Sequence, residues 1–380
     1  MRGPDVVRRR EDQRVALTGT VRRQPLRESS ARTYARALPI VPVRARGMTV
    51  EGADGRRYLD CLSGDGALAL GHNHPVVLAA VREVLDSGAP IGVLDLSTPV
   101  EERFLAELLA TLPPGLARCA RVRFCGPTVA DALALAAGPA GGAGGVVVES
   151  GVVVEPVSDD RLRRLRESTR ERGVPLVVDE TVTGVGRTGA FWAVEHSGVT
   201  PDVMVLAKAI GGSLPLAVVV HREDLDLAPA AGPPADVPRG NQLAMAAGAA
   251  TLAHVREQRL AARAGEVGAR MLRRLRSLAA GHRCVGEVGG RGLMLGLAFV
   301  DPASAPAPEV AAAVPGLPVP GLAAAVRREC LRRGLIVGIG GPHAEVVRLL
   351  PPLTVTDEQA DAVLERLADA VEAAAGAARS

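Results

Sequence analysis

Residues 174–215 read VPLVVDETVTGVGRTGAFWAVEHSGVTPDVMVLAKAIGGSLP and contain the only lysine of the chain, Lys208. The other 44 of the 45 basic residues are arginines. A guanidinium stays charged, whereas a desolvated lysine amine becomes neutral and nucleophilic. Lys208 also lies in the apolar run 203–212 (VMVLAKAIGG), a poor environment for a solvated surface charge. The single lysine therefore indicates a reactive amine.

An acidic pair ends the apolar run that precedes this lysine. Asp179 and Glu180 follow the segment VPLVV (residues 174–178), which is typical of a buried parallel strand. Ligands of open α/β sheets bind at the carboxyl ends of strands, so we expect Asp179 and Lys208 at one sheet edge. A lysine for a Schiff base and a carboxylate for the pyridinium nitrogen suggest pyridoxal phosphate (PLP). Two simpler alternatives stay open: Asp179 as a helix cap, and Lys208 as a product of arginine-rich composition.

Two motifs in this segment resemble those of a known family. Residues 179–189 (DETVTGVGRTG) resemble D-E-x-Q-T-G-x-G-R-T-G, and residues 206–212 (LAKAIGG) resemble L-S-K-A-I-G-G. These motifs mark the class III aminotransferases, a branch of the fold-type I PLP enzymes. Within that family the chain most resembles the diaminobutyrate–2-oxoglutarate aminotransferases, over roughly residues 32–370. The resemblance implies that Lys208 is catalytic and that Asp179 binds the cofactor.

The resemblance also implies an α/β fold with several parts. A flexible basic arm at residues 1–30 would precede an N-terminal segment, residues 31–75, that contributes to a small domain. The large PLP-binding domain would span residues 76–255, with a mostly parallel central sheet flanked by helices. A smaller α+β domain would span residues 256–380. Residues 241–279 are expected to be helical and to lead into that C-terminal domain.

Bulk composition narrows the class of protein. Apolar residues make up 47% of the 380 residues and aromatic residues 2%, which predicts a large, aliphatic core. Much of the net charge of +3 lies in the basic arm, so we expect no nucleic-acid partner. The five scattered cysteines predict free thiols in the cytoplasm and no metal site. No apolar run approaches the ~20 residues that span a membrane, so no membrane partner is expected.

A second cofactor contact is expected at residues 122–132 (VRFCGPTVADA), which resemble the family segment F-C-G-P-T-G-A-D-A. In the family this turn and the following helix N-terminus hold the cofactor phosphate through backbone N–H groups. The resemblance assigns Gly126, Thr128 and Val129 to that turn, with Val129 in place of a family glycine. It also assigns Val182 to the cofactor site, in place of a glutamine that relatives hold against the cofactor ring.

The glycine-rich stretch 63–75 (SGDGALALGHNHP) resembles a family segment whose glycine-rich part lies near the substrate. Asp65 introduces a charge where a small neutral residue is usual. His72 and His74 are interpreted as structural turn residues and not as catalysts.

Two further motifs concern the substrate and a partner subunit. Residues 346–353 (VVRLLPPL) resemble V-I-R-L-L-P-P-L, in which the arginine grips a substrate carboxylate, so Arg348 is assigned to the substrate. A surface arginine on an edge strand is the alternative for Arg348. Residues 237–245 (VPRGNQLAM) resemble T-F-R-G-N-Q-L-A-M, whose threonine reaches the phosphate of the neighbouring subunit. Val237 lacks that hydroxyl, and the resemblance implies a homodimer.

The chain is shorter than the family after residue 137. The stretch 138–149 (GPAGGAGGVVVE) replaces a longer family segment that includes the aromatic residue stacked on the cofactor ring. We expect this internal deletion to remove strands and helices from the centre of the parallel sheet.

These features predict a PLP-dependent aminotransferase. The resemblance implies amino transfer between a diamino or ω-amino acid, L-2,4-diaminobutyrate in particular, and 2-oxoglutarate or glutamate. Lys208 would act as general base and acid, Asp179 would stabilise the protonated ring, and Arg348 would bind the 2-oxo acid. Two alternatives stay open: a non-catalytic homologue that has lost cofactor contacts, and another fold-type I PLP reaction such as that of an aminomutase.

Overall fold

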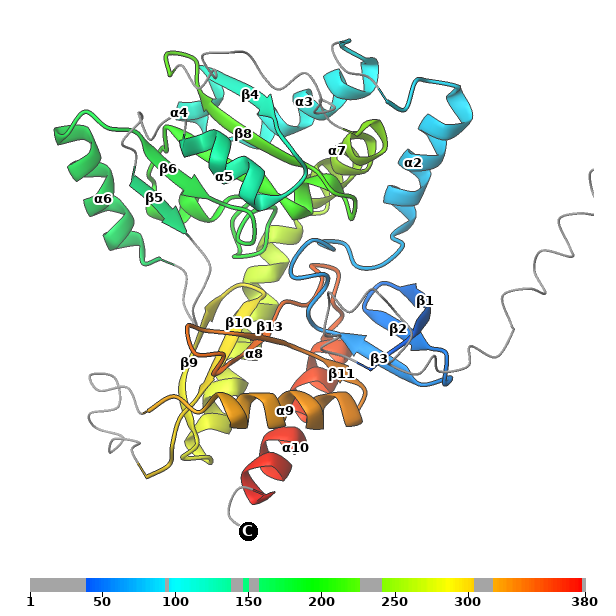
Figure 1. The fold of residues 1–380 in the computed structure, drawn as a ribbon, viewed down its shortest axis with the longest axis vertical. Coiled ribbons are helices and arrows are strands. Elements are labelled where there is room, and N and C mark those ends of the chain that lie inside the picture. The colour runs from blue at the N-terminus through cyan, green and yellow to red at the C-terminus, as the bar shows by residue number, and fades with distance from the viewer. Residues whose placement is uncertain are drawn as a thin grey trace, which may run out of the picture.

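A computed structural model describes residues 39–92, 96–137, 146–149, 157–225, 241–303 and 317–377 of the chain. The predicted basic arm at residues 1–30 and Val237 lie outside these ranges. The described strands form three sheets. Figure 1 shows the five-stranded sheet at one end of the molecule and the two four-stranded sheets toward the other.

The five-stranded sheet has the strand order β4-β8-β7-β6-β5. Its strands are β4 (Ala120–Phe124), β8 (Ala217–Arg222), β7 (Val203–Ala207), β6 (Leu176–Asp179) and β5 (Val146–Glu149). β8 runs antiparallel to β4 and β7, while β7, β6 and β5 are parallel to one another. All strands but β8 therefore point the same way, and their carboxyl ends meet at one edge. The predicted α/β fold with a mostly parallel sheet is confirmed.

The expected loss from the centre of this sheet is wrong. The shortened stretch leads into β5, which stands at the edge of the described sheet. β7 and β6 each keep a hydrogen-bonded neighbour on both sides. The strands that carry Lys208 and Asp179 therefore stay fully paired, because a missing edge removes no hydrogen bonds from the strands inside.

Apolar side chains cover both faces of this sheet. Val178 and Met204 contribute to the main core, whereas their neighbours Val177 and Val205 belong to a second cluster on the opposite face. The helix α5 (Val129–Ala137) packs on β7 and β8 and supplies buried residues to that second cluster. A strand buried on both faces needs apolar residues throughout, which explains the continuous apolar runs of the sequence.

Further helices surround the sheet. α7 (Gln242–Glu257) packs against α2 (Pro75–Ser87) and α3 (Pro99–Thr111), and α6 (Asp159–Glu171) packs against β6 (Figure 1). The remaining elements of this part are short: α4 (Pro114–Ala117) and the 3₁₀ turns η2 (Ala193–Ser197) and η3 (Lys208–Gly211).

Two glycines let η3 approach α7 closely. A Cβ at Gly248 would stand 2.0 Å from the carbonyl oxygen of Ile210, and a Cβ at Gly212 would stand 2.3 Å from that of Ala247. Gly212 also has a φ of +57°, which favours glycine. Because these contacts are between backbone atoms, η3 has little freedom to move relative to α7. The helix α7 therefore fixes the position of the turn that begins at Lys208.

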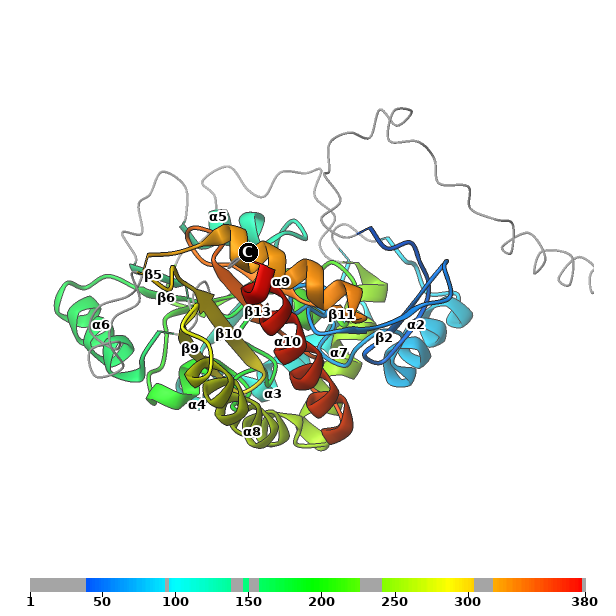
Figure 2. The same ribbon diagram turned by 90° about the horizontal axis from the view of Figure 1, so that it is seen from below.

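A second group of elements follows α7. An antiparallel sheet contains β12 (Gly338–Gly340), β13 (Val346–Leu349), β10 (Met294–Phe299) and β9 (Val285–Arg291) in that order. α8 (Leu260–Ala280) and α9 (Pro320–Arg332) pack on this sheet, and α10 (Asp357–Ala377) packs on both helices (Figure 2). The predicted helical character of residues 241–279 is confirmed, but as two helices, because Arg259 has a φ of +51° and separates α7 from α8.

The third sheet joins the two ends of the chain. It contains β1 (Pro42–Arg46), β2 (Thr49–Gly52) and β3 (Arg57–Asp60), with β11 (Leu335–Ile336) parallel to β3. The N-terminal segment is thus hydrogen-bonded to the C-terminal part. The domain boundaries after residues 75 and 255 stay predictions.

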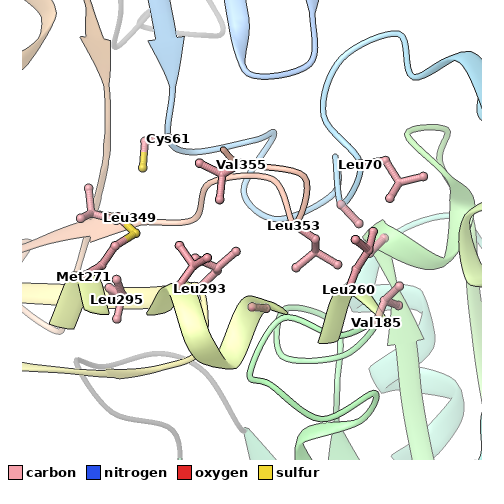
Figure 3. Packing of buried hydrophobic residues seen from close by; sticks show 14 of the residues in the cluster. Cys61, Leu70, Val185, Leu260, Met271, Leu293, Leu295, Leu349, Leu353 and Val355 are labelled. Carbon is pink, nitrogen blue, oxygen red and sulfur yellow. The ribbon is translucent and has the colours of Figure 1, made fainter. Parts of the chain in front are cut away.

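One continuous core connects these parts. Leu70 from the N-terminal segment, Val185 from the loop after β6 and Leu353 after β13 all belong to it (Figure 3). Arg187 lies buried in the same region, at 2% exposure, and donates hydrogen bonds to the carbonyl oxygens of Leu293 and Pro351. The loop after β6 is therefore held by the second group of elements.

Gly248→Ala should destabilise the protein because the new methyl group meets the backbone of η3. We expect a loss of about 1–3 kcal/mol in the free energy of unfolding, the usual cost of overpacking. Urea unfolding followed by circular dichroism measures this change.

Gly376→Ala is the matched control, because Gly376 lies in α10 and a Cβ there meets nothing within 4 Å. We expect it to be neutral or to stabilise by about 0.4–1 kcal/mol. Equal midpoints for the two variants would contradict the close approach of η3 and α7.

Candidate active site

Lys208 directly follows β7 and begins η3. Its φ is +58°, a left-handed conformation that residues with side chains seldom adopt. Such backbone outliers persist when surrounding packing enforces them, and they concentrate at functional sites. The Lys208 side chain is 22% exposed, so its amine lies at the sheet edge and not in the apolar core.

Asp179 is the last residue of β6 and pairs with Val205 of β7. Because β6 and β7 are parallel neighbours, Asp179 and Lys208 lie at the same carboxyl edge of the sheet, as predicted. The Oδ1 of Asp179 accepts a hydrogen bond from the N–H of Thr181 at 2.8 Å. The residues after Asp179 form turns and no α-helix, so the alternative of a helix cap is wrong.

Asp65 joins the lysine to a second cation. Its Oδ2 accepts a hydrogen bond from Lys208 Nζ at 2.6 Å, and its Oδ1 accepts one from Arg348 Nη2 at 2.7 Å. Lys208 Nζ also donates to the backbone carbonyl of Asp65 at 3.1 Å. Burial raises the pKa of Asp65, but the hydrogen bond from Lys208 and the charges of Lys208 and Arg348 outweigh it, so the pKa lies below its ordinary value. The sequence marked Asp65 only as an unusual charge.

A tight turn presents Asp65. Four successive residues, Ser63 to Gly66, have positive φ. The Asp60 carboxylate accepts hydrogen bonds from the N–H groups of Leu62 and Ser63, each at 2.9 Å, and pairs with His72 Nε2 at 2.8 Å. Asp60 therefore fixes the turn, and this contact agrees with the interpretation of His72 as a structural residue.

Arg348 lies beside β12, in which two of the three residues are glycines. It is on β13 opposite Gly338, and a Cβ at Gly340 would stand 2.6 Å from its Cδ and 2.8 Å from its Nε. Its Nε is buried and has no hydrogen-bond partner among the described residues. β13 lies between β12 and β10, so the alternative of an arginine on an edge strand is wrong. The glycines give the arginine the room to reach Asp65.

The predicted phosphate turn lies at the same sheet edge. The N–H of Cys125 donates to the carbonyl oxygen of Ala217 at 3.4 Å, and Ala217 pairs with Ala207, the residue before Lys208. Gly126 follows, and an added Cβ there would stand 2.5 Å from Asp131 Oδ2. The turn is thus two strands away from the lysine.

A capping box closes the start of α5. The N–H of Thr128 donates to Asp131 Oδ2 at 3.0 Å, and the N–H of Asp131 donates to Thr128 Oγ1 at 3.1 Å. The first-turn N–H groups of Val129 and Ala130 are then the donors left for an anion. Val129 begins the helix without positive φ, so its position does not require glycine.

Val182 lies beside the turn that presents Asp65. A Cβ at Gly66 would stand 3.7 Å from Val182 Cγ1, an ordinary van der Waals distance. The structure therefore brings together Lys208, Arg348 and Val182 around residues 65–66. It places Asp179, Gly126, Thr128 and Val129 along the same sheet edge.

Glu180 is a buried carboxyl group that supports the loop after β6. Its Oε2 accepts hydrogen bonds from Thr183 Oγ1 at 2.6 Å and from the N–H of Ala193 at 3.0 Å, and its Oε1 accepts one from the N–H of Val194 at 2.8 Å. Burial raises the pKa of Glu180 to about 7, although these hydrogen bonds lower it.

A comparison with known protein families identifies the class of protein. The family described as aminotransferase class-III matches residues 30–136 and 134–371. The chain belongs to this family, whose cofactor is PLP. The two matched pieces meet where the sequence is shortened.

Individual relatives agree with that class. The chain is 38% identical to the diaminobutyrate–2-oxoglutarate aminotransferase of Rhizobium meliloti, over 92% of each chain. It is 32% identical to the enzyme of the same name from Haemophilus influenzae, over 94% of this chain and 96% of the relative. Among solved structures, an ornithine aminotransferase from Plasmodium yoelii superposes with a TM-score of 0.75 at 26% identity, covering 90% of this chain and 96% of the other. The alignment with the Rhizobium enzyme spans 439 positions, more than the 380 residues of this chain. This chain therefore has gaps where the Rhizobium enzyme has residues.

The residues at the sheet edge fit PLP. A strained turn presents an amine, the neighbouring strand ends in a carboxylate, and the start of α5 offers N–H groups to an anion. The Thr128–Asp131 capping box uses part of that helix end, so the phosphate contact rests on the backbone of the first turn.

Three further findings concern metal ligands, cysteines and membrane-spanning helices. Within the described ranges, no group of three or more His, Cys, Asp or Glu residues is placed to hold a metal ion. All five cysteines are free thiols. In the part of the chain that the structure describes, no helix is long and apolar enough to cross a membrane.

Glu180 should make the protein less stable as the pH rises from about 4.5 to about 7. In this window the folded state keeps a proton on Glu180 that the unfolded state has lost, so raising the pH favours unfolding. The effect should reach about 3 kcal/mol in the free energy of unfolding. Urea unfolding at several pH values measures it.

Glu180→Gln is the comparison variant. Its amide does not titrate and costs a hydrogen bond equally at every pH, so the variant lacks the pH-dependent loss of stability that Glu180 causes. We expect the wild type to lose stability relative to the variant across the window. Parallel curves would contradict the raised pKa of Glu180.

Proposed function

We propose that this chain transfers an amino group between L-2,4-diaminobutyrate and 2-oxoglutarate, with glutamate as the other product or donor. The names of the two relatives at 38% and 32% identity support this pair of substrates. The observation that carries the site assignment is the convergence of Lys208 and Arg348, 143 and 283 residues away in sequence, on the single carboxylate of Asp65.

Each group at the sheet edge has a proposed task. Lys208 would hold PLP covalently, Asp179 would hold the ring nitrogen, and the start of α5 would bind the phosphate. When bound, PLP withdraws electrons from the carbon that carries the amino group. Val182 would contact the ring from the side of the Gly66 turn.

Lys208 would also move the proton. The amine of Lys208 would take a proton from the amino donor and return it, as a general base and then a general acid. Arg348 would hold a carboxylate of the 2-oxo acid, because a guanidinium pairs with a carboxylate through two parallel hydrogen bonds.

The assembly and the cellular location of the protein are also proposed here. A homodimer and a cytoplasmic location follow from the family resemblance, and Val237 at the proposed subunit contact lies outside the described residues. In the non-catalytic alternative, the protein keeps the fold but does not bind the cofactor. Covalent attachment of PLP to the protein distinguishes the enzyme from this alternative.

Borohydride reduction of the full chain with PLP should attach the cofactor to Lys208. Because Lys208 is the only lysine, the modified protein should yield the uncleaved tryptic peptide 188–222, and the unmodified protein should be cut at Lys208. Mass spectrometry distinguishes the two. The Lys208→Ala variant should retain no visible absorption from lysine-bound PLP after gel filtration. A folded wild type without attached cofactor would favour the non-catalytic homologue.

Arg348→Gln should raise the KM for 2-oxoglutarate roughly 10- to 100-fold, the loss expected for a hydrogen bond to a charged group. Glutamate formation from L-2,4-diaminobutyrate measures it, with ornithine and acetylornithine as competing donors. Arg82→Gln, an exposed arginine on α2, is the control and should leave the KM unchanged. An equal KM in all three proteins would remove Arg348 from the substrate site.

A further inference from the structure

Asp65 forms an ion pair with Arg348, the residue that the proposed function assigns to the substrate carboxylate. Arg348 Nη2 donates to Asp65 Oδ1 at 2.7 Å, and the other oxygen of the same carboxylate binds Lys208 at 2.6 Å. Both cations of the site are thus paired with an anion from the protein itself.

Asp65 binds the part of Arg348 that a substrate carboxylate would use. A guanidinium grips a carboxylate through two neighbouring N–H groups. The Nε of Arg348 is buried beside Gly340, so its open edge is the pair of Nη atoms. Asp65 already binds one of them. Each Nη atom carries two N–H groups, so a substrate carboxylate that binds both Nη atoms must share Nη2 with Asp65 or displace it.

The charges point the same way. Lys208 and Arg348 carry two positive charges against the one negative charge of Asp65. Asp65 and Arg348 by themselves form a neutral pair. A dicarboxylate then meets an arginine that is already neutralised, whereas an amino donor with a second amine meets a carboxylate.

The turn that presents Asp65 does not swing aside as a unit. Residues Ser63 to Gly66 all have positive φ, and the buried carboxylate of Asp60 holds the N–H groups of Leu62 and Ser63. The Asp65 side chain itself is 42% exposed, so it has room to rotate from Arg348. Displacement therefore costs the ion pair and leaves the backbone in place.

We propose that Asp65 is a specificity-determining residue that competes with substrate carboxylates for Arg348. It weakens the binding of a dicarboxylate such as 2-oxoglutarate. This inference rests on the proposed function, because it takes Arg348 as the carboxylate site.

Glutarate, which has both carboxylates of 2-oxoglutarate but no reacting carbonyl, tests the proposal by calorimetry on the PLP-loaded full chain. Asp65→Asn should bind glutarate about tenfold more tightly than the wild type. A tenfold change in affinity is larger than an exposed ion pair usually contributes and smaller than a buried hydrogen bond to a charged group can contribute. We expect an intermediate value because Asp65 is partly exposed. Asparagine tolerates the positive φ of this position, which keeps the turn intact.

Asp86→Asn is the matched control, since it removes the same charge from the exposed end of α2 and should bind glutarate like the wild type. Arg348→Gln, alone and with Asp65→Asn, should lower glutarate binding at least tenfold and remove the effect of Asp65.

Other results of the glutarate-binding experiment would contradict the proposal. Equal affinities for the wild type and Asp65→Asn, with weak binding by Arg348→Gln, would overturn the competition and leave Arg348 as the substrate site. Weaker binding by Asp65→Asn would show that Asp65 positions Arg348, which also overturns the proposal. Unchanged binding by Arg348→Gln would refute the substrate site itself.

Discussion

The carboxylate of Asp65 joins three segments that are far apart in the sequence. Lys208 at the end of β7 and Arg348 on β13 each donate a hydrogen bond to it, at 2.6 and 2.7 Å. Two cations held this close would repel one another, and their repulsion would be strongest where water is excluded. The anion between them lets the five-stranded sheet, the antiparallel sheet of β13 and the N-terminal segment meet at one place. The position of each cation in the site therefore depends on this contact.

Backbone geometry supports the contact from all three sides. Lys208 has positive φ and is fixed by the approach of η3 to α7 at Gly212 and Gly248. Asp65 has positive φ within the turn that Asp60 holds. Arg348 crosses β12, where only glycine leaves it room. Unusual backbone and glycine-lined approaches thus gather around one carboxylate. Strain of this kind persists only where packing enforces it.

The sequence predicted the local parts of this arrangement better than their assembly. Continuous apolar runs predicted β6 and β7, because strands buried on both faces need apolar residues at every position. The acid and the lysine at the ends of those runs predicted their common edge. The contact of Asp65 with Arg348 could not be predicted, because it depends on how β13 lies relative to residues 63–66. The break of the predicted helix at Arg259 was also missed, since a left-handed arginine carries no local signal of the kind that glycine gives.

The shortening of the chain shows why the edge of a sheet tolerates change better than its middle. β7 is flanked by β8 and β6, and β6 is flanked by β7 and β5, so the strands that end at Lys208 and Asp179 keep their hydrogen bonds. Their side chains stay packed between the main core and the cluster under α5. Although the chain is shortened before β5, the lysine, the aspartate and the start of α5 all lie at one carboxyl edge of the described sheet. Lys208 and Asp179, to which the proposed function assigns the chemistry, thus depend on strands that lie inside the described sheet.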